Sequence, residues 1–166
     1  LPPLPQFTEG WQFGEPDLVI EMTEPYTLPA GSGDVFRSFV IPIPLPTRKY
    51  VRAIEFRAGN PRIVHHVVMQ IDERRSTRYL DEQDPEPGYE GMYSGEARSP
   101  DGQFLGWTPG KVPMAVPEDM AWRLEAGSDL LLKLHLLPSG KPEVVRCAVG
   151  FYFTEKAPAR IPFGLR

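Results

Sequence analysis

The sequence predicts an all-β fold, an antiparallel sandwich or jelly roll, and three observations lead to this prediction. The 166 residues include 20 prolines, more than twice the usual share of about 5%. These prolines are scattered along the chain, where they leave little room for long helices. Short apolar segments alternate with turn residues at close spacing, and nothing suggests the alternation of strands and helices that builds a parallel sheet.

In the first half of the chain, four segments have the apolar and β-branched composition of strands. They are expected at 17–22, 35–42, 50–56 and 63–71. Residues 24–33 are expected to form a turn region, because Pro25, Pro29 and Gly31 interrupt them. The sequence Gly-Asn-Pro at 59–61 ends the third strand in the same way.

In the second half, strands are expected at 103–108, 120–124, 129–137 and 144–154. The third of these, DLLLKLHLL, is the most apolar, and a proline- and glycine-containing turn separates it from the last. Residues 73–103 are charged and without a clear period. They predict a long loop with one helical turn at 76–82, and a loop of this length in a compact domain is usually functional or disordered.

The length of the chain fits one domain, which we expect to span residues 17–157. Residues 1–16 are rich in proline and glycine and predict a linker whose end is pinned to the fold by Trp11 and Phe13. Residues 158–166 are expected to form a second linker, toward a further C-terminal domain.

Charge and composition exclude several classes of function. The net charge is −4, and no basic patch with interleaved aromatic residues occurs, so nucleic acid is not an expected partner. No apolar run approaches the length of a membrane span. The single cysteine, Cys147, lies in an alternating strand-like segment, which favours a buried, inert thiol over a reactive one. No serine or cysteine nucleophile has recognisable histidine and carboxylate partners.

The three histidines of the chain are the strongest functional signal. His65 and His66 are adjacent in one apolar strand, and His135 lies in the other strongly apolar strand. Neutral imidazole is the commonest transition-metal ligand, and three imidazoles suit zinc, copper, iron or nickel. The alternative is a set of histidines that are simply satisfied in the core or at a sheet edge.

Strand geometry complicates a shared ion. Neighbouring residues of a regular strand point to opposite faces, so His65 and His66 can bind one ion only at a strand end, at a bulge or between sheets. His135 alternates with Lys133 and is expected on the less buried face of its strand.

Four motifs occur in the order of a known family. They are residues 64–69 (VHHVVM), 105–110 (LGWTPG), 116–124 (VPEDMAWRL) and 131–135 (LLKLH). Over roughly residues 17–155 the chain resembles the N-terminal copper domain of the copper type II, ascorbate-dependent monooxygenases, the family of peptidylglycine alpha-hydroxylating monooxygenase and dopamine beta-monooxygenase. It looks closest to bacterial relatives. Residues 26–29, 35–42 and 51–56 resemble the first strands of that domain.

The resemblance implies an antiparallel jelly roll of eight or nine strands. It also implies that His65, His66 and His135 bind one electron-transferring copper, which cycles between Cu(I) and Cu(II), with zinc as a possible substitute. The implied partner is a C-terminal second copper domain or a cytochrome c-like module of the same protein. The implied location is the periplasm or another extracytoplasmic space.

The chain also departs from the family. Oxygen activation there belongs to a second copper, which a His-x-His pair and a methionine hold in a second domain, and this chain contains no His-x-His. We therefore expect no hydroxylation by this chain alone. The alternative function is a metal-free or zinc-binding jelly-roll interaction module that uses surfaces around Tyr89, Tyr93 and Trp107.

Overall fold

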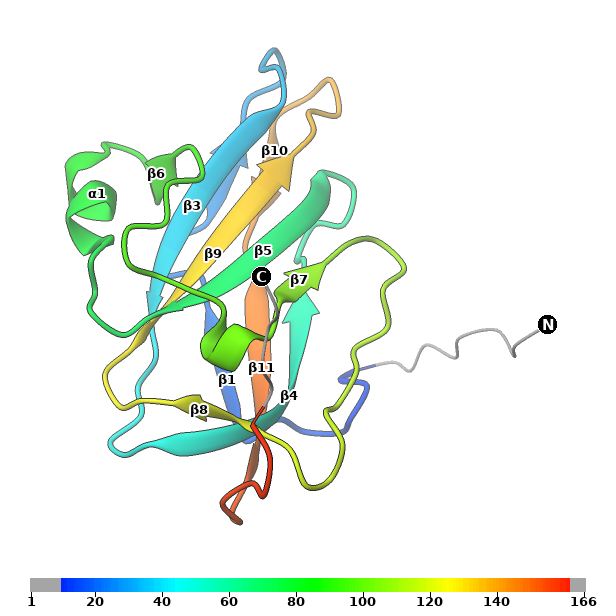
Figure 1. Cartoon of the computed structure of the whole chain (residues 1–166). Coiled ribbons are helices and arrows are strands. Elements are labelled where there is room, and N and C mark those ends of the chain that lie inside the picture. Colours follow the sequence, from blue (N-terminus) through cyan, green and yellow to red (C-terminus); the bar gives the residue numbers. More distant parts are fainter. Residues whose placement is uncertain (1–9, 162–166) are drawn as a thin grey trace.

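The computed structural model describes residues 10–161 and confirms the predicted all-β sandwich (Figure 1). Residues 1–9 of the predicted first linker and residues 162–166 of the second lie outside the described residues. Every named strand pairing between residues 10 and 161 is antiparallel. No helix in this part of the chain is long and apolar enough to cross a membrane.

Three sheets make up the described fold. One sheet has the order β1-β11-β4-β8, with bounds Leu18–Glu21, Ala148–Thr154, Lys49–Arg57 and Trp122–Leu124. A second has the order β6-β3-β9-β5-β7, with bounds Tyr89–Glu90, Val35–Pro42, Asp129–Leu136, Val64–Asp72 and Leu105–Trp107. The third pairs β10 (Glu143–Val145) with β2 (Tyr26–Leu28). The short helix α1 is Arg78–Gln83, and a 3₁₀ turn, η1, is Pro100–Gly102.

The predicted strands recur with small shifts at their ends, and the differences have tertiary causes. The region 24–33 contains β2, which forms because β10 offers it a partner. The single strand expected at 144–154 is divided at Arg146 and Cys147, because β10 pairs with β2 whereas β11 pairs with β1 and β4. The helical turn expected at 76–82 is α1, and the loop around it contributes the two-residue strand β6.

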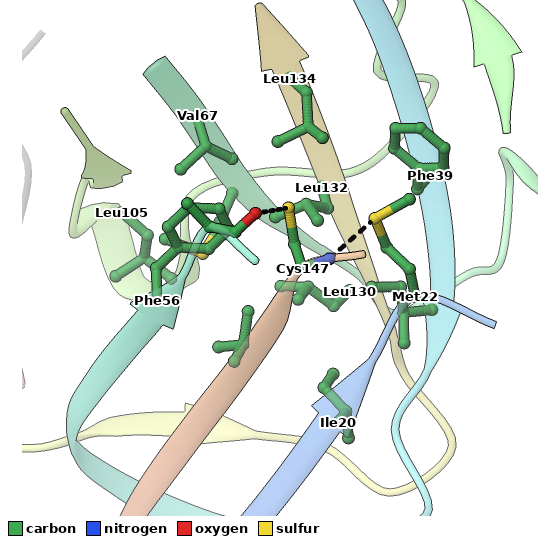
Figure 2. Close-up of a cluster of buried hydrophobic side chains, with 14 of the residues drawn as sticks. Ile20, Met22, Phe39, Phe56, Val67, Leu105, Leu130, Leu132, Leu134 and Cys147 are labelled. Atoms are coloured by element: carbon green, nitrogen blue, oxygen red, sulfur yellow. Dashed lines mark hydrogen bonds between the residues drawn. The ribbon is translucent and has the colours of Figure 1, made fainter. Parts of the chain in front are cut away.

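The core lies between the four-stranded and the five-stranded sheet. Every second residue of β9 points into it, and these side chains are fully buried: Leu130, Leu132, Leu134 and Leu136. Figure 2 shows Cys147 among Leu130, Leu132 and Leu134. Its Sγ donates to the carbonyl of Ala58 at 3.3 Å. Burial raises the pKa of this thiol to about 12. The buried thiol predicted from the sequence is therefore confirmed.

The two ends of the described chain pack onto the fold. The guanidinium of Arg57 lies over the ring of Trp11 at 4.6 Å, and Phe13 meets the ring of Tyr152 edge-on at 5.5 Å. These contacts agree with the expected pinning of the first linker. Near the other end, Arg160 forms an ion pair with Asp119, with Nη2 2.6 Å from Oδ1.

Candidate metal centre

Antiparallel pairing brings the three histidines to one end of the five-stranded sheet. His65 and His66 lie at the start of β5, and His135 lies near the end of β9, its neighbour in the sheet. In Figure 1 the first residues of β3 and β5 and the last residues of β9 lie at the same end of the sandwich. Residues about 70 positions apart thus become neighbours.

A β-bulge removes the difficulty of two adjacent histidines. Val64 is opposite Leu136, but His66 is opposite His135, so His65 is an extra residue in β5. A bulge re-aims side chains beside it. Val64 belongs to the core while His66 lies on the outer face of the sheet, and the ring of His65 turns toward the same outer side. The bulge was one of the three arrangements that the sequence left open.

The Nδ1 atoms of the three rings converge. The Nδ1 of His65 lies 3.2 Å from that of His66 and 3.1 Å from that of His135, and the third side of this triangle is 3.3 Å. The group could therefore hold a metal ion. The centre of such a triangle is about 1.9 Å from each nitrogen, and imidazole–metal bonds measure about 2.0–2.1 Å. The three Nδ1 atoms are therefore spaced closely enough for one ion to bind all of them at ordinary bond lengths.

Hydrogen bonds among the three rings cannot by themselves satisfy all three Nδ1 atoms. A neutral imidazole has one N–H and one lone pair, so three Nδ1 atoms that face one another cannot all be paired. Burial, followed by the charges of His135 and His65, lowers the pKa of His66 below its usual range. The neutral form, which is the form that binds a metal, is thereby favoured at His66.

Burial differs strongly among the three ligand candidates. His65 is exposed, His66 is half-buried, and His135 is only 8% exposed. His135 lies on the expected face of β9, which points away from the core leucines, but this face is buried as well, with Lys133 9% and His135 8% exposed. The segment that follows α1 covers this face of β9, and its Ser94 accepts a 2.8 Å hydrogen bond from Nζ of the buried Lys133.

Two residues that sequence reasoning missed contact His135. Asp34 Oδ2 lies 3.1 Å from His135 Nε2. Phe36, directly opposite His135 in the β3–β9 pairing, stacks on the imidazole with a centroid distance of 4.2 Å and an interplanar angle of 11°. Neither residue stands in a recognisable motif, because both contacts arise from the pairing of strands distant in sequence.

Other candidates named from the sequence lie elsewhere. Tyr89 is buried, with its hydroxyl donating to the carbonyl of Tyr93, so it offers no surface to a partner. Trp107 packs on Phe56 at 5.1 Å. Two cavities of about 290 Å³ each are lined by residues other than the histidines, one beside α1 and one beside β7.

Comparison with known proteins adds no assignment. No protein-family model matches the chain, and no curated protein matches it.

Proposed function

We propose that this chain binds one copper ion through His65, His66 and His135, and that the ion transfers electrons to a partner redox domain of the same protein. The observation that supports this most directly is the triangle of Nδ1 atoms, with sides of 3.1, 3.2 and 3.3 Å. The three rings would not have to rearrange in order to bind one ion.

The donor set favours a borderline transition metal. Three imidazoles without a carboxylate or a thiolate are poor ligands for magnesium or calcium, and they suit copper or zinc. The resemblance to the copper domain of the ascorbate-dependent monooxygenases favours copper, which would supply one-electron chemistry at this site. Zinc in the same site is the chief alternative.

Electron transfer is supported by the surroundings of the site. His65 is exposed, so a partner can approach the centre closely. The partner would be a second copper domain or a cytochrome c-like module, in a periplasmic or other extracytoplasmic location.

The metal and its ligands can be tested by equilibrium dialysis followed by elemental analysis. We expect one copper ion per wild-type chain, and a loss of more than about 100-fold in affinity in His65→Ala, His66→Ala and His135→Ala, because each variant removes a direct ligand. Cys147→Ala is the control, since this thiol lies in the core, and it should bind copper like the wild type. Unchanged affinity in the three histidine variants would contradict the proposal.

The redox role needs a separate experiment. Electron paramagnetic resonance of the Cu(II) form should show coupling to imidazole nitrogens. Ascorbate should abolish this signal, and a mild oxidant should restore it with the ion still bound. A centre that binds zinc much more tightly than either state of copper would support the zinc-binding alternative instead. A centre that retains no metal after dialysis would support the metal-free interaction module.

A further inference from the structure

The carboxylate of Asp34 contacts His135 on the side of the ring away from the Nδ1 triangle. Its Oδ2 lies 3.1 Å from His135 Nε2. The Asp34 side chain is 58% exposed, whereas that of His135 is 10% exposed. Asp34 directly precedes β3, and the β3–β9 pairing brings it to a histidine 101 residues away.

This contact determines where the ring proton lies. An ionised carboxylate only accepts hydrogen bonds, so Nε2 of His135 must carry the proton that the contact requires. A neutral imidazole protonated on Nε2 has its lone pair on Nδ1. This is the nitrogen that faces His65 at 3.1 Å and His66 at 3.3 Å.

The chain segment that carries Asp34 also fixes the plane of the ring. Phe36 lies two residues later and stacks parallel on the imidazole of His135. Asp34 therefore restrains the ring along its edge, and Phe36 restrains it over one face. Together they leave the ring little freedom to turn its Nδ1 away from the other two histidines.

We infer that Asp34 is a positioning residue of the metal centre: it selects the tautomer of His135 whose Nδ1 lone pair points to the ion. Because the Asp34 carboxylate is negatively charged and is hydrogen-bonded to Nε2, it also makes the Nδ1 lone pair a stronger electron-pair donor to the ion. This is the usual effect of a carboxylate behind a ligating histidine. This inference rests on the proposed metal function, and it explains how one of the three ligands, His135, is held in the tautomer that binds the ion.

The first test uses the metal-free protein. Long-range proton–nitrogen correlation spectra of the ¹⁵N-labelled histidine rings report which nitrogen is protonated. In the wild type we expect His135 protonated on Nε2, and in Asp34→Ala we expect a mixture of tautomers. Asp34→Asn should largely keep the tautomer, because its amide oxygen can still accept from Nε2.

The second test measures copper affinity by competition with a chromophoric chelator. Asp34→Ala should bind copper about 10–100-fold more weakly than the wild type, the range typical of lost partners behind a ligand. Asp34→Asn should fall between the two, since it keeps the hydrogen bond and loses the charge. Glu155→Ala is the matched control, because it removes one exposed negative charge directly after β11, and β11 ends at the opposite end of the sandwich (Figure 1).

The two tests separate failure of the inference from failure of the function. An unchanged tautomer together with unchanged copper affinity in Asp34→Ala would overturn the inference and leave the metal site intact. A tautomer that depends on Asp34 in a wild-type chain that binds no metal would refute the metal function while supporting tautomer selection. Circular dichroism should show all variants folded, because Asp34 is an exposed residue outside the core.

Discussion

Deletion of His65 should leave the fold intact and remove the metal site. In the β5–β9 pairing Val64 is opposite Leu136, His66 is opposite His135, and His65 is the additional residue between them. Removing it joins the two halves of β5 in one regular register. Every other side chain of the strand then keeps the face that it has in the wild type, because the side-chain period of a strand is two.

Deletion of Val67 is the matched control, and its expected cost is much larger. Val67 is 1% exposed, so its loss removes about 1.5–3 kcal/mol of apolar burial. The regular register would then place His66 opposite Leu134 on the core side, where an unsatisfied imidazole costs a further ~1–3 kcal/mol. Deletion of the exposed His65 should instead change the free energy of unfolding by about 1 kcal/mol or less.

Urea denaturation followed by tryptophan fluorescence, combined with copper dialysis, measures both effects. We expect the chain without His65 to unfold near the wild-type midpoint and to bind copper more than about 100-fold more weakly, because one ligand is gone. The chain without Val67 should unfold at a much lower urea concentration. Equal destabilisation by the two deletions would refute the assignment of His65 as the bulged residue. Wild-type copper affinity after deletion of His65 would refute its role as a ligand.

Three further predictions concern Asp72, Cys147 and Phe36. Burial opposes ionisation of Asp72, but hydrogen bonds from Ser76 and Thr77 outweigh it and lower its pKa. Asp72→Asn should therefore lower the free energy of unfolding at pH 7 by about 1–3 kcal/mol. In urea titrations this difference should shrink as the pH falls from about 3.9, the unfolded pKa, through the lower folded pKa. Cys147, whose pKa burial raises to about 12, should react with iodoacetamide at pH 8 only in denaturant, as mass spectrometry would show. Phe36→Leu removes the stack on His135 and should weaken copper binding a few-fold in the chelator assay, while stability changes by about 1 kcal/mol or less.

The fold class could be predicted from the sequence because it depends on local properties, namely scattered prolines and short apolar segments. The strand at Val35–Pro42 was predicted at its observed bounds. The division of 144–154 into β10 and β11 could not be predicted, because the residues on both sides of Arg146 and Cys147 have equal strand character. Only the choice of partner strands separates them.

The candidate site was predictable in its residue types and not in its geometry. Three histidines in two apolar strands indicate a metal site by chemistry alone. The sequence indicates the bulge only weakly. Val64 and Val67 are both apolar and both face the core, although residues three apart on a regular strand point to opposite faces. Nothing in the sequence indicates Asp34, because its contact with His135 exists only through the β3–β9 pairing.

The long charged segment between β5 and β7 explains why the buried ligand can be rigid. Several contacts anchor it to β3. Among them, Asp84 binds the buried Arg37, with Oδ1 2.7 Å from Nη2, and the carbonyl of Gly91 accepts a 2.8 Å hydrogen bond from Ser38. Between α1 and η1 it covers the outer face of β9, where Lys133 lies two residues before His135 on the same face. A ligand held by packing loses less freedom when the ion binds. The burial of His135 under this segment and the exposure of His65 at the bulge therefore suit one centre, held firmly on its inner side and open to a partner on its outer side.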